Sequence, residues 1–165
     1  MSNQLEPMVD CAPELDALDR VGAELMETMF FTEAVATPCS HAWLESAVGA
    51  LVRFEGTHRG EVHLAVSPDA AQFIAGGFLG LDSLELSGEQ LHHVILELAN
   101  IYCGSAMSHL WPESRLALDA PELLDPRHGL ETGWHRCFEL PEGMLAITLR
   151  LQNDGLSAVP EGSAV

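Results

Sequence analysis

Lysine is absent from this sequence. Its seven basic residues are all arginines and face 25 acidic residues, so the formal net charge is −18. A chain of this charge lacks the basic surface that attracts nucleic acids, and an anionic membrane surface would repel it. The composition therefore excludes nucleic acid and anionic membrane as partners, and it favours a partner that offers a basic contact residue.

The sequence also lacks any run of about 18 apolar residues, so we predict no membrane-spanning helix. The N-terminal stretch MSNQLEPMVDCAPELD has neither the basic region nor the apolar region of a secretory signal. We therefore expect a cytoplasmic protein.

Paired cysteines are missing as well. The four cysteines are far apart in the sequence and form no CxxC motif. In a protein of the cytoplasm, such cysteines are typically reduced and buried. We therefore predict free thiols at Cys11, Cys39, Cys103 and Cys137.

The apolar residues that are present suffice for one folded domain. The chain has 165 residues, of which 47% are hydrophobic, enough to bury a substantial single core. We expect a flexible leader over residues 1–12, a single domain over residues 13–152, and a disordered polar tail over residues 153–165.

Two shorter helices are predicted by their start signals. Pro13 with Glu14 and Asp16 suits a helix N-terminus, and apolar residues then recur with helical spacing until the pattern fades before Pro38. The sequence Ser67-Pro68-Asp69 starts a second helix, which should stop around 76–80.

Alternating apolar residues predict the strands. Residues 46–55 and the run ending at Val66 form one hairpin, 115–119 is a short strand, 125–133 is a loop, and 134–140 with 144–152 form a second hairpin. The predicted fold is α+β, with an antiparallel-rich sheet covered by two long helices in the order α-β-β-α-α-β-β-β. Each half is a helix followed by strands, which indicates a weak internal duplication.

The most informative stretch is a long helix between Leu86 and Trp111. Ser87 and Gln90 have the spacing of a capping box, and Leu86 and Leu91 have that of a hydrophobic staple. Pro112 cannot continue the helix, so the helix should end near Leu110.

A helical projection of this stretch separates a buried from an exposed face. The predicted buried residues are Leu91, Val94, Ile95, Leu98, Ala99, Ile101, Tyr102 and Ala106. The predicted exposed residues are His93, Glu97, Asn100, Gly104 and Ser108, with Leu96 and Met107 at the edge of that face.

The exposed face carries residues that helix propensity does not favour. Glu97 and Asn100 are three residues apart and therefore adjacent on the surface, with His93 one turn before them and Gly104 one turn after. Asparagine competes with the backbone for hydrogen bonds, and a glycine inside a helix costs about 1 kcal/mol relative to alanine. From the pattern alone, a solvated polar face with one tolerated glycine is the more common interpretation.

Glu97-Leu98-Ala99-Asn100 followed by Gly104 resembles the E-x-x-N…G signature of the CheX/CheC-type chemotaxis phosphatases. The resemblance extends to ELMETMFF in the first helix, to GEVHLAVSPDAAQFIAGGFLG, and to LALDAPELL after the long helix. It covers roughly residues 15–152 in the same order of elements. It implies a phosphatase that acts on the aspartyl phosphate of a CheY-like response regulator.

The resemblance also implies roles for individual residues. Asn100 would orient a water in line with the phosphorus, and Glu97 would pair with the receiver's active-site lysine. His93, Leu96, Gly104 and Met107 would contact the partner. The protein would need no cofactor of its own, because Mg²⁺ is expected in the receiver.

Two positions depart from the family pattern. His93 stands where the family usually has Asp or Ser, and a histidine can change its charge near neutral pH. In the first helix, the stretch from Glu24 to Glu27 has glutamate where a second site would need asparagine. We therefore predict one site, as in the CheX branch, and by that resemblance a homodimer joined through sheet edges.

Two other functions stay open. His92, His93, Glu97 and His109 lie on the long helix, and His135 and Cys137 share a strand face, so a metal-dependent enzyme is one alternative. His93 and Glu97 supply only two ligands, however, and His92 points about 100° away from His93. The other alternative is a non-catalytic CheX-like module that binds a receiver or a flagellar-motor partner without turnover.

Overall fold

The computed structural model describes residues 12–129 and 133–152. The predicted leader, apart from Ala12, and the predicted tail lie outside these residues, as does the part of the predicted loop at 130–132. The described chain forms one antiparallel sheet of seven strands in the order β1-β6-β7-β3-β2-β4, with β5 also paired to β2. The predicted α+β class is confirmed.

The helices begin and end close to the predicted positions. They are α1 (Pro13–Phe30), α2 (Pro68–Leu79) and α3 (Gly88–Leu110). The strands are β1 (Val35–Thr37), β2 (Val48–Gly56), β3 (Arg59–Val66), β4 (Leu116–Leu118), β5 (Glu122–Leu123), β6 (Trp134–Leu140) and β7 (Gly143–Gln152). Short 3-10 helices are η1 (Ala42–Ser46), η2 (Ser83–Glu85) and η3 (Pro126–Gly129).

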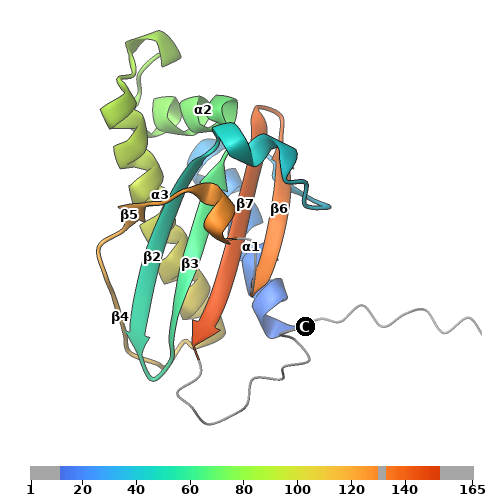
Figure 1. Cartoon of the computed structure of the whole chain (residues 1–165), viewed down its shortest axis with the longest axis vertical. Coiled ribbons are helices and arrows are strands. Elements are labelled where there is room, and N and C mark those ends of the chain that lie inside the picture. The colour runs from blue at the N-terminus through green and yellow to red at the C-terminus, as the bar shows by residue number, and fades with distance from the viewer. Residues whose placement is uncertain (1–11, 130–132, 153–165) are drawn as a thin grey trace, which may run out of the picture.

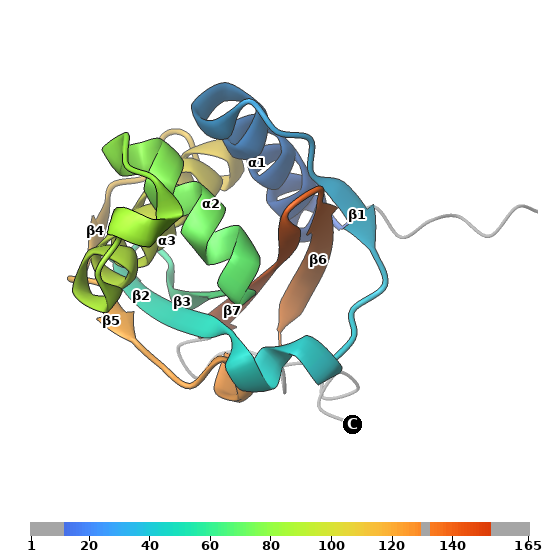
Figure 2. The ribbon, with the colours of Figure 1, turned by 90° about the horizontal axis from the view of Figure 1, so that it is seen from above.

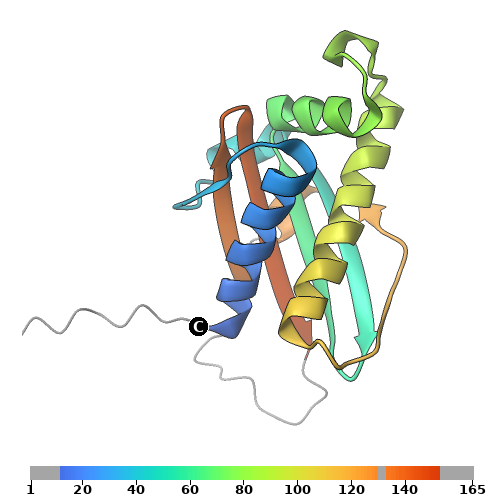
Figure 3. The ribbon, with the colours of Figure 1, turned by 180° about the vertical axis from the view of Figure 1, so that it is seen from behind.

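The two long helices, α1 and α3, lie side by side on one face of the sheet (Figures 1 and 3). The shorter α2 crosses one end of this layer, as the view from above shows (Figure 2). The main core lies between these helices and the sheet, and the apolar residues of β2, β3 and β7 that point toward the helices are buried in it. The predicted two-layer arrangement is therefore present.

Close contacts hold α1 against both α3 and the sheet. The Tyr102 hydroxyl of α3 donates a hydrogen bond to the Leu18 carbonyl of α1, at 2.5 Å. A Cβ atom at Gly22 would come within 2.6 Å of the Phe138 ring, so only glycine lets α1 approach β6 this closely. Arg136 and Asp19 add an ion pair of 2.9 Å between β6 and α1.

The opposite face of the sheet is covered only in part, by η1 and η3 (Figures 1 and 2). Beneath η1, Leu44, Ala65, Cys137 and Ala146 form a small second core. Cys39 and Cys137 form a disulfide across it, with their Cα atoms 5.2 Å apart. The prediction of free thiols at these two positions is wrong, because pairing of β1 with β6 places Thr37 opposite Cys137 and so brings Cys39 within reach.

The strand order supports the predicted internal duplication. If β1 is matched with β4, β2 with β6, and β3 with β7, the strand order is the same when it is read from either edge of the sheet. The same exchange matches α1, which precedes β1, with α3, which precedes β4. α1 and α3 are therefore equivalent helices of a two-fold repeat, and α2 has no counterpart.

The predicted order of elements omits two strands, β1 and β5. They contain 3 and 2 residues, too few for an alternating pattern to be seen in the sequence. Both are defined by their pairing with longer strands, β6 and β2.

Candidate functional site

The long helix α3 carries the predicted site and begins as predicted. The Ser87 hydroxyl accepts a hydrogen bond from the Gln90 backbone N–H at 3.1 Å, and the Gln90 side chain accepts one from the Ser87 N–H at 2.9 Å. This is a complete capping box, which satisfies two N–H groups at the start of the helix. The position of every later residue along α3 follows from this start.

The inner face of α3 is packed in the main core. Of the eight residues predicted to be buried, six are buried: Val94, Ile95, Leu98, Ala99, Tyr102 and Ala106. Leu91 and Ile101 are half-buried at the border. The helix is therefore held rigidly, and its outer face is a fixed surface.

The outer face carries the five predicted residues. His93 and Ser108 are exposed, while Glu97, Asn100 and Gly104 are partly exposed. No hydrogen bond or ion pair joins the Glu97 or Asn100 side chain to any of the residues that the structure describes. Both side chains thus retain their hydrogen-bonding groups for a partner or for water.

Met107 does not lie where the projection placed it. Its side chain is only 3% exposed and belongs to the main core. α3 contacts α1, α2 and several strands, so its buried arc is wider than a helix packed on one neighbour would have. The prediction of Met107 as a partner contact is therefore wrong, whereas Leu96 is half-buried at the rim.

Gly104 has no internal reason to be glycine. A Cβ atom at this position would lie 4.0 Å from its nearest neighbour, Leu118 Cδ2, which is ordinary contact. Alanine would therefore fit and would favour the helix. The space above Gly104 continues into an open groove of about 680 Å³ between α1 and α3, with Leu25 and Ser108 among its lining residues.

His93 borders a second hollow, at the beginning of α3. This open pocket of about 310 Å³ is lined by Leu79 at the end of α2 and by Ser87, Glu89, Gln90 and His93. The surface that begins at Asn100 thus continues along α3 to the end of α2.

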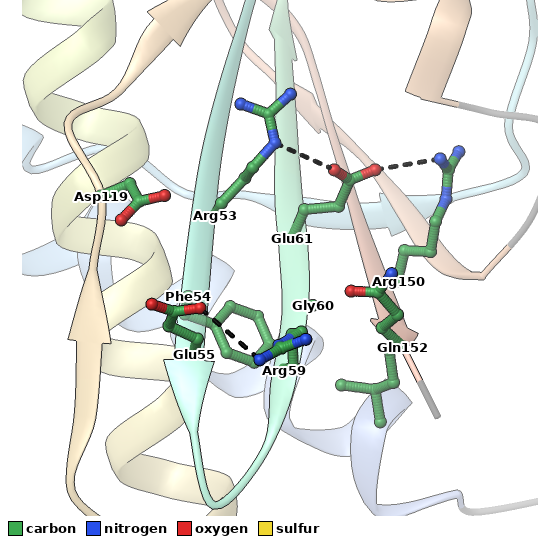
Figure 4. Close-up of a pocket in the computed structure, with 10 residues that line it drawn as sticks. Arg53, Phe54, Glu55, Arg59, Gly60, Glu61, Asp119, Arg150 and Gln152 are labelled. Atoms are coloured by element: carbon green, nitrogen blue, oxygen red, sulfur yellow. Dashed lines mark hydrogen bonds and ion pairs between the residues drawn. The ribbon is translucent and has the colours of Figure 1, made fainter. Parts of the chain in front are cut away.

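A further pocket, of about 480 Å³, lies on the opposite face of the sheet (Figure 4). Glu61 of β3 is placed between Arg53 of β2 and Arg150 of β7 by the strand register, and the Arg150–Glu61 distance is 2.9 Å. Arg53 also pairs with Glu122 at 3.0 Å. This cluster cannot be predicted from the sequence alone, because it depends on the pairing of three strands.

The cluster in Figure 4 is balanced in charge. Each of its arginines pairs with a carboxylate, and the pocket also contains Asp119 and the ion pair of Arg59 with Glu55, at 3.8 Å. No cysteine, serine or histidine lines this pocket. These ion pairs stabilise the sheet and offer no nucleophile.

The residues of the metal alternative do not converge. Among the described residues, no group of three or more His, Cys, Asp or Glu side chains has the arrangement of a metal site. Cys137 is disulfide-bonded and therefore offers no thiolate. Cys103 lies buried in α3, where burial raises the pKa of its thiol to about 12, so it is an inert core residue.

No helix within the described part of the chain is long and apolar enough to cross a membrane.

Residues 48–131, about half of the chain, match the family model of the chemotaxis phosphatase CheX. The chain belongs to the CheX family. The family match includes α3 with Glu97, Asn100 and Gly104.

Solved structures of CheX proteins have the same fold. The chain is 17% identical to chemotaxis protein CheX from Vibrio vulnificus, with a TM-score of 0.70 over 86% of this chain and 97% of that one. It is 13% identical to CheX from Desulfovibrio desulfuricans, with a TM-score of 0.65 over 86% and 100% of the two chains. CheX from Borrelia burgdorferi, solved as a CheX–CheY–BeF3–Mg²⁺ complex, is 16% identical, with a TM-score of 0.61 over 86% and 96%.

No curated protein matches the sequence.

Helix α1, which the internal repeat relates to α3, presents Glu24 and Glu27 to solvent. Where α3 has asparagine three residues after its glutamate, α1 has a second glutamate. Of the two helices related by the internal repeat, only α3 carries the family motif.

Proposed function

We propose that this protein accelerates hydrolysis of the aspartyl phosphate on a CheY-like response regulator in chemotaxis or two-component signalling. One observation carries the proposal. In a chain of the CheX family, Glu97 and Asn100 lie together on the outer face of a rigidly packed helix, and no described side chain engages them.

The chemistry requires positioning more than reactive groups. Phosphoryl transfer proceeds through a loose transition state, so an enzyme acts mainly by aligning the attacking water and by stabilising charge. A carboxamide both donates and accepts hydrogen bonds. Asn100 inserted beside the phosphoryl group would hold a water in line with the phosphorus, and no covalent intermediate on this protein is needed.

Glu97 would fix the position of the receiver relative to α3. It lies one turn of helix from Asn100, and its carboxylate would form a charge-assisted hydrogen bond with the lysine of the receiver's active site. The Mg²⁺ belongs to the receiver's own site, and we propose no cofactor for this chain. Gly104 supports the same geometry, because a missing side chain there lets the partner's backbone approach α3.

The proposed assembly follows the family resemblance. We propose a cytoplasmic homodimer joined through the edges of the sheet. Among the described strands, β1 pairs only with β6 and β4 pairs only with β2, so both edges offer backbone groups for such pairing.

One residue favours a second candidate, a CheX-like module that binds a receiver or a flagellar-motor partner without turnover. His93 is exposed at the position where the family pattern has Asp or Ser. Histidine in place of an acid at this contact would change the affinity for the receiver. Turnover would be lost as well only if Asn100 were displaced relative to the phosphoryl group.

The experiment follows loss of phosphate from a CheY-like receiver that has been phosphorylated with acetyl phosphate. We expect wild-type protein to shorten the lifetime of the phosphoryl group. Glu97→Ala should need a higher receiver concentration for the same rate, because it removes the contact with the receiver's lysine. Glu27→Ala, on the equivalent helix α1, is the matched control, because Glu27 is exposed and lies outside the groove beside Gly104, and it should behave as wild type.

Two outcomes would contradict the proposal. A phosphate lifetime that saturating wild-type protein leaves unchanged would favour the non-catalytic module. A rate lost equally in Glu27→Ala and Glu97→Ala would mean that the site is not confined to α3.

A further inference from the structure

We propose that the segment of residues 78–87, which we name the hook, is a second contact for the receiver domain. It joins the end of α2 to the beginning of α3 and projects past the end of the sheet (Figures 1 and 3). This inference rests on the proposed function, since it assigns a further surface to the same partner.

The hook concentrates exposed apolar side chains. Leu84 is 98% exposed, Phe78 41% and Leu79 38%, and these are three of the six large hydrophobic residues that are exposed in the described part of the chain. Single exposed apolar residues are common in proteins, whereas a group of them at one place marks an interaction surface.

The shape of the hook is defined by backbone hydrogen bonds. Gly80 ends α2 in a left-handed conformation, at a φ of 67°, and its N–H bonds to the Gly76 carbonyl. The Leu81 N–H bonds to the same carbonyl at 3.0 Å, and the Glu85 N–H bonds to the Asp82 carbonyl at 2.9 Å. Leu84 is therefore presented at the tip of a short 3-10 helix.

The hook is continuous with the proposed site. Leu79 and His93 line the same pocket of about 310 Å³. His93 lies one turn of helix before Glu97, and Glu97 lies one turn before Asn100. The exposed surface thus runs from the end of α2 along α3 to the residue that we propose to orient the water.

The distances fit one partner. At a rise of 1.5 Å per residue, Ser87 and Asn100 are about 20 Å apart along α3. A typical protein–protein interface covers about 800 Å² on each side, with 20–30 residues. A patch of about 800 Å² is about 30 Å across, so an interface that has Asn100 away from its centre extends to the hook.

The charges around the hook indicate the chemistry of the surface that it meets. Asp82, Glu85 and Glu89 flank the apolar residues, and residues 78–93 contain no arginine or lysine. An apolar patch with a basic rim fits this arrangement, and a basic residue is also what Glu97 requires. A receiver that presents its active-site lysine to Glu97 would supply this basic residue and, around the lysine, the basic rim that the hook requires.

The test measures binding separately from turnover. A CheY-like receiver loaded with BeF3 and Mg²⁺ is titrated with wild-type protein, Leu84→Ser and Phe31→Ser. Phe31 is the matched control, because it is also apolar and 90% exposed but directly follows α1 and lines neither of the hollows beside α3. We expect Leu84→Ser to weaken binding about five- to thirty-fold, whereas Phe31→Ser binds as wild type.

The expected kinetic result is a higher receiver concentration for half-maximal rate in Leu84→Ser, with an unchanged rate at saturation. Equal affinity in wild type and Leu84→Ser would overturn the hook proposal and leave the proposed function intact. If wild type binds the receiver without accelerating loss of phosphate, the proposed function fails and the affinity comparison still decides on the hook. A change from dimer to monomer on Leu84→Ser, with receiver affinity unchanged, would assign the hook to a second copy of this chain instead.

Discussion

At the scale of single residues, Gly104 shows how α3 differs from a helix selected for stability alone. Glycine inside a helix is about 1 kcal/mol less favourable than alanine. At most positions in this fold where glycine is needed, a Cβ atom would collide with a neighbour, as at Gly22, whereas Gly104 has room. The proposed approach of a partner at Gly104 would account for the stability that is lost there.

This argument predicts opposite effects of substitution on stability and on binding. Gly104→Ala should raise the free energy of unfolding by about 1 kcal/mol, measured by urea denaturation. Gly104→Leu should fold, since a Cβ atom there meets only Leu118 Cδ2, at 4.0 Å, and an open groove continues above it, and should weaken receiver binding at least about ten-fold. Normal receiver affinity in folded Gly104→Leu would contradict the role of this position.

His63 is a buried histidine of the sheet whose surroundings predict a dependence of stability on pH. It is 8% exposed on β3, and its Nε2 lies 2.9 Å from Glu61 Oε1. Burial lowers the pKa of His63 below its ordinary value. The neighbouring Glu61 opposes this shift, while Arg150 and Arg53 add to it.

A histidine with a lowered pKa in the folded state binds fewer protons there than in the unfolded chain. Its contribution to stability is therefore complete above the ordinary value of about 6.5 and declines as the pH falls below it. We expect the urea midpoint of wild type to fall between pH 7.5 and pH 5.5 more steeply than that of His63→Gln. Equal slopes for the two proteins would show that His63 titrates normally.

At the scale of elements, the disulfide links the segment before η1 to β6. Cys39 and Cys137 are separated by 98 residues in the sequence. Closing a loop of this length stabilises a fold by roughly 2–5 kcal/mol, mainly through the unfolded state. The small core beneath η1 has few residues, so the covalent link is a large part of what holds η1 to the sheet.

Reduction should therefore loosen this end of the molecule. We expect dithiothreitol to lower the free energy of unfolding of wild type by roughly 2–5 kcal/mol, measured by denaturant titration. The double variant Cys39→Ser with Cys137→Ser should resemble reduced wild type and should not respond to dithiothreitol. A wild-type stability that is insensitive to reductant would show that the two cysteines are not bonded in solution.

The elements that could be predicted from the sequence are those with local signals. The capping box at Ser87, the proline at position 68 and the alternation along β7 each depend on residues close in the chain. The strands β1 and β5, the disulfide and the ion pairs of Glu61 depend on which distant strands become neighbours. Met107 was misplaced for the same reason, because its burial is decided by the elements that surround α3 and not by α3 itself.

The candidate site was predictable to a similar extent. Glu97 and Asn100 were assigned from helical spacing together with a family motif, and the packing of α3 placed both on its outer face. The hook could not be predicted, because the sequence between α2 and α3 has no motif. The exposure of Leu84 becomes visible only once both helices have been placed.

At the scale of the whole molecule, all of the arginines lie outside α3. Three of the arginines, Arg53, Arg59 and Arg150, line the ion-pair pocket on the face away from α3 (Figure 4). α3 itself contains no basic residue other than histidine. In a chain of net charge −18, α3 thus presents Glu89 and Glu97 with no arginine beside them on the helix, which suits the proposed contact with basic residues of a receiver.

The internal repeat gives the molecule two equivalent helices, of which one has the motif. Of these two helices, α3 therefore carries the candidate site on its outer face. The central claim is that Asn100 on this face positions the attacking water.

The most direct test compares wild type with Asn100→Ala in single turnovers, with a phosphorylated CheY-like receiver and saturating protein. We expect the rate of phosphate loss in Asn100→Ala to fall on the order of 100-fold, to near the spontaneous rate, while its affinity for the BeF3-loaded receiver stays close to that of wild type. Phosphate loss at the wild-type rate in Asn100→Ala would contradict the account.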